Sequence, residues 1–185
     1  AARAQVLAEE TRDLDALVGR LAQSGSLRAA LAALPGPVLR PADPGAAPPA
    51  APPARTARSE PPAAPTPYLL PAQGRILAGF GEAQGLGGVR RPGIALGPAP
   101  GAQVVAPGAG RIAFAAPYRG YGHIVIVEHA GGWTSLVTGL ASLSVEVGQP
   151  VVAGSPLGRA PGTAPQIGLE LRRGNEPVNP LDRLR

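Results

Sequence analysis

The chain opens with the hydrophobic spacing of a helix. Residues 1–23 consist mainly of Ala, Leu, Glu, Arg and Gln, which form helices readily. Four apolar residues repeat at the i, i+3, i+4, i+7 spacing of one helix face: Leu14, Leu17, Val18 and Leu21. A Ser-Gly-Ser break follows, and a second short helix ends at Pro35. Residues 1–35 are therefore predicted to be a helical segment, either the end of a coiled coil or a regulatory helix that covers a groove on the following domain.

The hydrophobic pattern disappears between residues 36 and 67. Pro, Ala and Arg dominate this stretch, and large apolar side chains are almost absent, so it cannot bury enough surface to offset the entropy lost on ordering. Twelve of the 24 prolines lie between Pro35 and Pro67. Because proline favours extended polyproline II conformations, we predict a semi-stiff linker.

From residue 68 onward the pattern changes to short β-branched runs separated by glycine-containing turns. No helical period lies between the runs, which are residues 93–96, 103–106, 110–114, 123–128, 133–137 and 166–171. This pattern predicts a mainly β, antiparallel domain over residues 68–185. In the run 123–128 both alternating sets of side chains are apolar, which predicts a central strand covered on both faces.

Composition excludes several classes of chemistry. The absence of Cys excludes disulfides, thiolate metal sites and cysteine nucleophiles, and all 17 basic residues are Arg, so a catalytic or carrier lysine is excluded too. The net charge is +5, but aromatic residues are few and no basic block occurs, which argues against nucleic-acid binding. No apolar run of about 18 residues could span a membrane. The chain begins without Met or a signal sequence, so we expect a mature product or an excised fragment.

The scarcity of histidine bears directly on catalysis. A catalytic zinc needs about three protein ligands and an open position for water. The only two histidines, His123 and His129, lie six residues apart on one predicted strand, a separation of about 20 Å that is too long for one ion. No Gly-x-Ser-x-Gly motif supports a serine nucleophile. Glu128 and Glu170 could form a glycosidase pair, although carboxylates at strand ends are typically solvated or paired with arginine.

Eight short motifs follow one another through the β region: residues 79–81, 91–96, 100–106, 108–112, 120–129, 147–158, 168–174 and 177–180. Their ordered succession resembles the LytM, or lysostaphin-type, zinc peptidase domain and covers nearly all of residues 71–183. The resemblance implies a LytM-type antiparallel β-sheet. It also implies a structural, hydrogen-bonding role for His129 and a surface position for His123.

The resemblance further implies that the zinc site is lost. Active members bind one zinc through a His-x-x-x-Asp strand and a late His-x-His motif. In this sequence the first pair falls on Arg91 and Ala95, and the late pair falls on Gln166 and Gly168. The histidine that helps polarise the attacking water falls on Gly139. We therefore expect a non-catalytic domain, a pseudoenzyme without metal or other cofactor.

Among LytM relatives without zinc ligands, the chain most resembles the EnvC-type murein hydrolase activators. Residues 169–180 repeat their closing Leu-Glu-Leu-Arg-Arg and Val-Asn-Pro pattern, and a coiled coil precedes the domain in that family. The resemblance implies a periplasmic activator of peptidoglycan amidases in cell division, signalled through the coiled coil by an ABC-transporter-like complex. Two alternatives stay open: a peptidoglycan-binding module that targets the cell wall through the same groove, and a hydrolase with an unforeseen metal set.

Five residues are predicted to line the groove that binds the partner: Arg90, Arg91, Tyr121, Gln166 and Arg172. Arginines at the edge of a groove can form bidentate pairs with carboxylates on a partner helix. Docking of a helix in the groove is the proposed binding mode. Tyr121 fits a structural Gly-Tyr-Gly turn equally well. If the N-terminal helix occupies the groove, the chain is autoinhibited.

Overall fold

The computed structural model describes residues 13–21, 23, 64–84 and 89–184. Residues 13–21 form a helix, and the remainder of the described chain is mainly strand, so the predicted fold class is confirmed. Most of the predicted linker and the second helix before Pro35 lie outside the described residues. The described helix is too short and too polar to cross a membrane.

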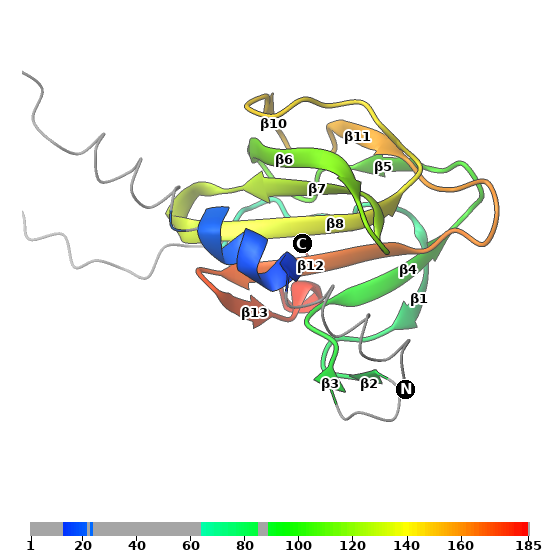
Figure 1. Ribbon diagram of the computed structural model, residues 1–185, viewed down its shortest axis with the longest axis horizontal. Helices are drawn as coiled ribbons and strands as arrows, with labels where there is room; N and C mark the ends of the chain where they lie inside the picture. The colour runs from blue at the N-terminus through cyan, green and yellow to red at the C-terminus, as the bar shows by residue number, and fades with distance from the viewer. Residues whose placement is uncertain (1–12, 22, 24–63, 85–88, 185) are drawn as a thin grey trace, which may run out of the picture.

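A large antiparallel sheet organises the domain (Figure 1). Its strand order is β1 (Gly74–Ala78), β4 (Ile94–Pro98), β12 (Ile167–Arg173), β8 (Trp133–Leu140), β7 (Gly122–Glu128), β6 (Gly110–Tyr118) and β10 (Pro150–Val151). The short strand β13 (Glu176–Val178) pairs with β12 beside β4. Five of the six predicted β runs correspond to strands of this sheet.

Two smaller sheets and two 3-10 turns complete the domain. One sheet joins β5 (Gln103–Val105), β11 (Pro156–Arg159) and β9 (Ser142–Leu143). The other is a hairpin of β2 (Ala83–Gln84) and β3 (Val89–Arg90), which projects below the large sheet in Figure 1. The 3-10 turns are η2 (Ala130–Gly132) and η3 (Pro180–Arg183). The predicted run 103–106 forms β5.

The strands of the large sheet have two different faces because side chains alternate along each strand. On β12, Ile167, Leu169 and Leu171 are buried in the main core, which also contains Val104 of β5 and Leu157 of β11. The main core therefore lies between the large sheet and the three-stranded sheet. The opposite face of β12 carries Gly168, Glu170 and Arg172, which leaves room there for a polar site.

The central strand β7 is buried on both faces, as predicted. Val125 and Val127 belong to the main core. Ile124 and Ile126 point to the other side, where they form a second cluster together with Leu136 of β8 and two residues of the helix, Leu14 and Val18. Residues more than a hundred positions apart in the sequence thus share one apolar contact surface.

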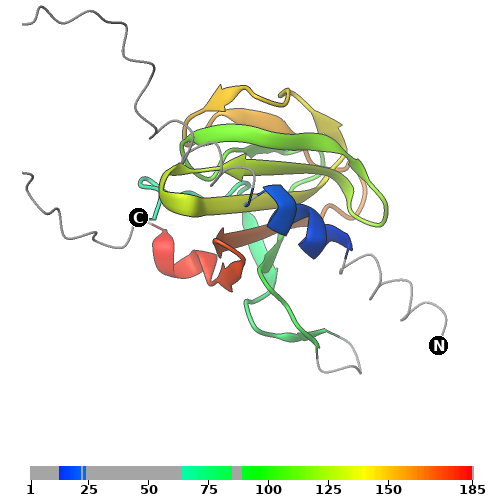
Figure 2. The ribbon, with the colours of Figure 1, turned by 60° about the vertical axis from the view of Figure 1, so that its left-hand side comes forward.

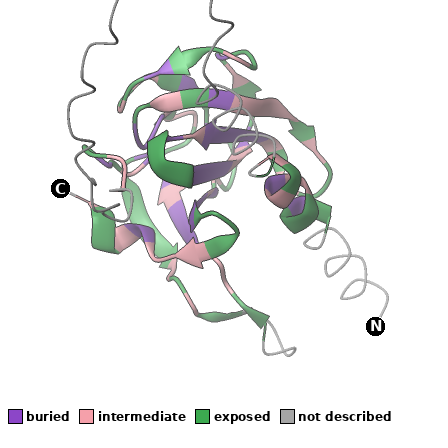
Figure 3. Ribbon diagram, turned by 90° about the vertical axis from the view of Figure 1, so that its left-hand side faces the viewer, coloured by how far each residue is buried: buried purple, intermediate pink, exposed green. Residues whose placement is uncertain are grey.

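The N-terminal helix lies across the second face of the large sheet (Figure 2). Its predicted apolar stripe faces the strands: Val18 is 0% and Leu14 is 6% exposed, and Leu17 and Leu21 are partly buried. The other positions of the helix are mostly exposed (Figure 3). Burial of an aliphatic side chain contributes about 1.5–3 kcal/mol, so the stripe is sufficient to dock the helix.

A buried hydrogen-bond chain fixes the start of the β domain. The Ala109 carbonyl oxygen can only accept, so His129 Nδ1, at 2.6 Å from it, carries the proton. Ser135 then donates to His129 Nε2 at 2.7 Å, and the Tyr68 hydroxyl donates to Ser135 Oγ at 2.9 Å. Burial raises the pKa of Tyr68 and lowers the pKa of His129. The structural role predicted for His129 is confirmed.

Candidate partner-binding groove

The face that carries the helix also contains a cavity of about 340 Å³, which we call the groove cavity. It lies beside the helix, between the β2–β3 hairpin, β4, β8 and β12. Its lining includes Leu14 and Asp15 from the helix and four polar or charged side chains from the strands and turns: Arg91, Thr138, Glu170 and Arg172. The cavity is present while the helix is docked.

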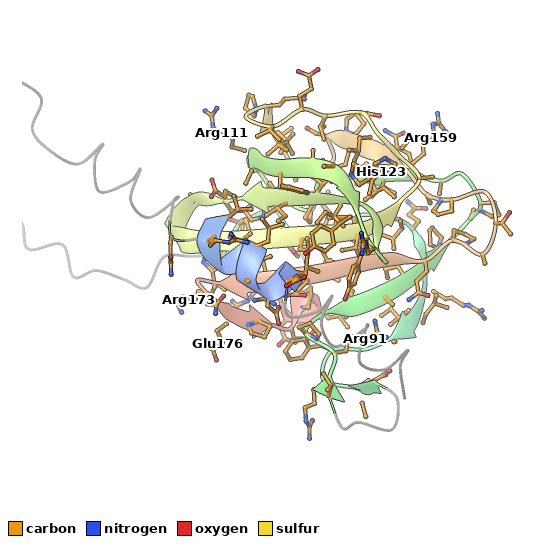
Figure 4. The ribbon with its side chains drawn as sticks, viewed as in Figure 1. Arg91, Arg111, His123, Arg159, Arg173 and Glu176 are labelled. Carbon is orange, nitrogen blue, oxygen red and sulfur yellow. The ribbon has the colours of Figure 1, made fainter. Side chains whose placement is uncertain are left out.

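Four of the five predicted groove residues line this cavity: Arg90, Arg91, Tyr121 and Arg172. They come from β3, the segment before β4, the β6–β7 turn and β12, so the fold brings together positions that are distant in sequence. Gln166, the fifth, is exposed just before β12 and does not belong to the lining. Figure 4 shows Arg91 on the same side of the sheet as the helix, near β3 and β4.

The positions expected to have lost zinc ligands lie close together on the sheet. Ala95 of β4 is paired in register with Gly168 of β12, which is paired in turn with Thr138 of β8. Ala95 is fully buried, and Gly168 lines the groove cavity together with Arg91. Gly139 is adjacent to Thr138 but does not line the cavity.

Two glycines at these positions leave no space for a side chain. A Cβ at Gly168 would lie 2.3 Å from Thr138 Oγ1. A Cβ at Gly139 would lie 2.1 Å from the Gln166 carbonyl oxygen, and the φ of Gly139, +88°, disfavours any other residue. Neighbouring atoms therefore fill the space that a ligand at either position would need. In the described part of the chain, no three His, Asp or Glu residues are grouped closely enough to hold a metal ion.

Arg172 is the central charge of the groove. It is 5% exposed, and it donates through Nε to Glu170 Oε1 and through Nη2 to Asp15 Oδ1 of the helix. Burial raises the pKa of Glu170, whereas the adjacent guanidinium opposes that shift. Burial would lower the pKa of Arg172, but Glu170 and Asp15 outweigh it and raise that pKa, so the cation is retained. The helix thus closes a carboxylate–guanidinium–carboxylate array.

Asp15, Glu170 and Thr138 were not predicted as site residues. Asp15 has a local signal, because it is an acidic residue next to Leu14 at the edge of the apolar stripe. Glu170 was noted only as a strand carboxylate, and its pairing with an arginine agrees with the non-catalytic interpretation of that residue. Thr138 carries no distinguishing signal in the sequence, since its importance comes from the register that places it beside Gly168.

Arg91 differs from Arg172 in the surroundings of its guanidinium. Its Nε is shielded from solvent and has no hydrogen-bond acceptor there. The backbone of Arg91 is held firmly: its N–H donates to the Glu82 carbonyl at 2.9 Å, and its carbonyl accepts from Gly81 at 2.9 Å. The neighbouring Arg90 is exposed and lies 3.4 Å from the Gly81 carbonyl oxygen through Nη1.

Tyr121 lies both in the β6–β7 turn and at the groove cavity. Its N–H donates to the Tyr118 carbonyl, and its own carbonyl accepts from Gly139, so it stabilises the turn between β6 and β7. Its ring lies 6.2 Å from that of Tyr118, packs against the cluster beneath the helix, and lines the groove cavity. His123, expected at the surface, is instead partly buried, with Nδ1 at 3.2 Å from the Leu140 carbonyl oxygen.

Comparison with known families assigns this domain. The sequence of residues 90–180, which contains most of the groove lining, matches peptidase family M23. These residues form a domain of peptidase family M23. The match includes seven of the eight motifs described above, all except residues 79–81, and the resemblance drawn from the sequence is confirmed.

The M23 domain has bacterial relatives with names related to the cell wall and division. The murein hydrolase activator EnvC of Escherichia coli K12 is 38% identical over 114 residues, which are 60% of this chain and 27% of EnvC. The cell division protein DipM of Caulobacter vibrioides is 32% identical over 110 residues, which are 57% of this chain and 18% of DipM. The chain therefore spans less than a third of the length of either relative.

Solved structures of M23 domains share the fold. The catalytic domain of lysostaphin from Staphylococcus simulans superimposes with a TM-score of 0.52 at 21% identity, covering 58% of this chain and 90% of that domain. An M23 peptidase structure from Pseudomonas aeruginosa gives 0.54 at 24% identity, covering 64% of this chain and 51% of that one. These neighbours are peptidases, so the fold alone does not distinguish catalysis from binding.

Proposed function

We propose that this chain is a non-catalytic activator of periplasmic peptidoglycan amidases in cell division. Its similarity to a murein hydrolase activator and to a cell division protein supports this proposal and is consistent with a location outside the cytoplasm. The observation that carries it is that the M23 groove already accommodates an amphipathic helix. Leu14 and Val18 occupy the apolar cluster, and Asp15 pairs with Arg172.

The proposed mechanism is docking of an amidase helix in the groove. A regulatory helix that covers the amidase active site would be drawn onto the surface that helix 13–21 occupies here. The activator then shifts an existing equilibrium of the amidase towards the open form and performs no chemistry itself. The apolar cluster would provide affinity, and the arginines would provide orientation through bidentate pairs with carboxylates.

Helix 13–21 has an autoinhibitory role in this proposal. It covers Ile124, Ile126 and Leu136, the apolar residues that a partner helix would need. The N-terminal segment 1–35, which contains this helix, is the proposed contact for an ABC-transporter-like division complex. Binding of that complex would weaken the hold of the helix on the groove, so that a partner helix could displace it from the docking surface.

An amidase assay tests the proposal. Release of dye from labelled murein is measured for a division amidase from the same bacterium, alone and with the full chain, and with the variant Val18→Asp. The substitution places a charge in the cluster beneath the helix but leaves the main core untouched. We expect greater stimulation by Val18→Asp than by the native chain. Absence of stimulation by both proteins would refute the activator function.

The alternative is a peptidoglycan-binding module that targets the cell wall. The groove cavity favours this alternative because Arg91, whose Nε has no acceptor in the described chain, lines the cavity and could bind a stem-peptide carboxylate. Co-sedimentation of the full chain with purified murein, in the absence of amidase, measures this activity. Strong co-sedimentation without amidase stimulation would favour the targeting module.

A further inference from the structure

We propose, on the basis of the activator function, that the partner helix displaces helix 13–21 in two steps. Carboxylates of the partner pair first with Arg91 and then with Arg172, where one of them replaces Asp15. One acidic residue of the partner pairs first with Arg91 in the groove cavity. A second acidic residue then takes Arg172 from Asp15, and the apolar residues of the partner replace Leu14 and Val18. The partner is therefore an amphipathic helix with two carboxylates on its docking face.

The first step depends on the state of Arg91 while helix 13–21 is docked. Arg91 is only partly buried and borders the groove cavity, and its Nε has no hydrogen-bond acceptor in the described chain. The groove cavity provides about 340 Å³ beside it, enough for an acidic side chain. A carboxylate can thus bind Arg91 before the helix has moved.

The second step depends on the state of Arg172. Its Nε is engaged by Glu170 and its Nη2 by Asp15, and the residue is only 5% exposed. An incoming carboxylate therefore cannot reach it until Asp15 has left. Arg91 and Arg172 line the same cavity, so a partner held at Arg91 is positioned beside the ion pair that it must replace.

The ion pair between Asp15 of the helix and Arg172 can be replaced by a pair with a partner carboxylate. The Asp15 side chain is 51% exposed, whereas that of Arg172 is 6% exposed. An ion pair with one partner in solvent contributes little net stability, so its loss is offset when another carboxylate takes its place. Glu170 stays with Arg172 throughout, so the buried guanidinium is never left without a counter-charge.

Helix 13–21 also indicates the chemistry of the partner. It presents Leu14 and Val18 at i, i+4 spacing to the apolar cluster and Asp15 to Arg172. A competing helix needs the same elements: two apolar residues one turn apart and an acidic residue after the first. The additional requirement is a second acidic residue that reaches Arg91, for which the described chain supplies no equivalent.

The test measures association of the amidase with the full chain by stopped-flow fluorescence. The variants are Arg91→Gln, Val18→Asp and the double variant, and Arg159→Gln is the matched control. Arg159 is exposed on β11 and lies away from Arg91 in Figure 4. Hydrogen exchange of the residue 13–21 amides reports in each variant whether the helix is docked.

Stepwise exchange predicts a coupling between the two substitutions. In the native background, Arg91→Gln lowers the association rate constant about tenfold, because one steering and pairing contact is lost. In the Val18→Asp background, where the helix is released and Arg172 is accessible, the same substitution lowers it only about twofold. Arg159→Gln changes it by less than about twofold in either background.

Two results would overturn the exchange. The first is an Arg91→Gln effect equal to that of Arg159→Gln. The second is an Arg91→Gln effect of the same size in both backgrounds, which would make Arg91 an independent contact. In both cases amidase stimulation by the native chain would leave the activator function intact. Failure of every variant to bind and stimulate the amidase would instead refute the activator function and the exchange together.

Discussion

Arg172 connects three parts of the molecule at the scale of single residues. It stands on β12 beneath the helix and holds Glu170, a carboxylate that is itself 9% exposed. Such an array is weak support for stability as a whole, but it is costly to break, because removal of the cation leaves a buried carboxylate without compensation. We therefore expect the guanidinium to support the fold in addition to its proposed role in binding.

Replacement of Arg172 tests this structural role. Arg172→Met should lower the free energy of unfolding by about 3–5 kcal/mol, since Glu170 loses its counter-charge in a buried site. Urea denaturation followed by circular dichroism measures the change. Arg159→Met, at an exposed arginine, should change stability by less than about 0.5 kcal/mol. The double variant Arg172→Met/Glu170→Leu should recover most of the loss, and no recovery would contradict the explanation.

Gly168 and Thr138 provide a second test on this scale. Gly168→Ala should destabilise the domain by about 1–3 kcal/mol, because the new Cβ would lie 2.3 Å from Thr138 Oγ1. In a Thr138→Ala background the penalty should fall, since the hydroxyl is removed. Gly162→Ala is the control, because nothing lies within 4 Å of a Cβ at that position. Urea denaturation compares the variants, and equal penalties in both backgrounds would refute steric conflict with Thr138.

At the scale of elements, the relation between the helix and the large sheet determines what the groove can bind. The helix covers the face of β7 and β8 opposite the main core, so its removal exposes Ile124, Ile126 and Leu136 but leaves the main core intact. The helix is therefore an attachment to a folded domain rather than part of the core. Elements of this kind open at lower free energy than the strands beneath them.

Two substitutions on the helix separate packing from charge. Val18→Asp should abolish hydrogen-exchange protection of the residue 13–21 amides, because a carboxylate would be buried in the apolar cluster. Ala16→Asp introduces the same charge at an exposed position of the same helix and should leave protection nearly unchanged. The amides of β7 and β12 should remain protected in both variants. Loss of protection in the strands of Val18→Asp would show that the helix belongs to the core.

At the scale of the whole molecule, the buried hydrogen bonds that run from Tyr68 through Ser135 and His129 to Ala109 join the start of the β domain to its central strands. His129 accepts from Ser135 only while its ring is neutral, and burial lowers its pKa. In the unfolded chain the ordinary pKa is about 6.5, so the unfolded state binds a proton at a higher pH than the folded state does. Stability therefore depends on pH through this residue.

The sign of the dependence gives a prediction. The contribution of His129 is complete above about pH 6.5 and is lost progressively as the pH falls from there towards the lower folded pKa. Urea denaturation at pH 7.5, 6.5 and 5.5 measures it. His129→Gln should be less stable at pH 7.5 but should show a flatter profile between these pH values. A native profile that rises towards acid, or one parallel to that of His129→Gln, would contradict this assignment.

Much of the architecture could be predicted from local pattern. The six predicted β runs form strands, and residues 123–128 are covered on both faces, as expected. Both features were predictable because the order of apolar and polar side chains along a strand is a local property of the sequence. His123 was placed at the surface incorrectly, since its partner, the Leu140 carbonyl, belongs to the neighbouring strand. Gln166 was expected at the groove floor, but it precedes β12 and is exposed. Both residues depend on register rather than on local sequence.

The sequence by itself determined the secondary-structure elements and the classes of chemistry that the chain lacks the residues to perform. A strand or helix pattern and the absence of Cys and Lys can be read from individual positions. The expected loss of the zinc and base residues at Arg91, Ala95, Gly139, Gln166 and Gly168 follows from the family resemblance, which also rests on the sequence alone. The tertiary structure alone decided that Asp15 pairs with Arg172, 157 positions later, and that Arg91 Nε has no hydrogen-bond acceptor in the described chain. Such pairings depend on how the helix docks on the sheet. Docking is set by the combined packing of many residues and by strand register, which no short stretch of sequence encodes.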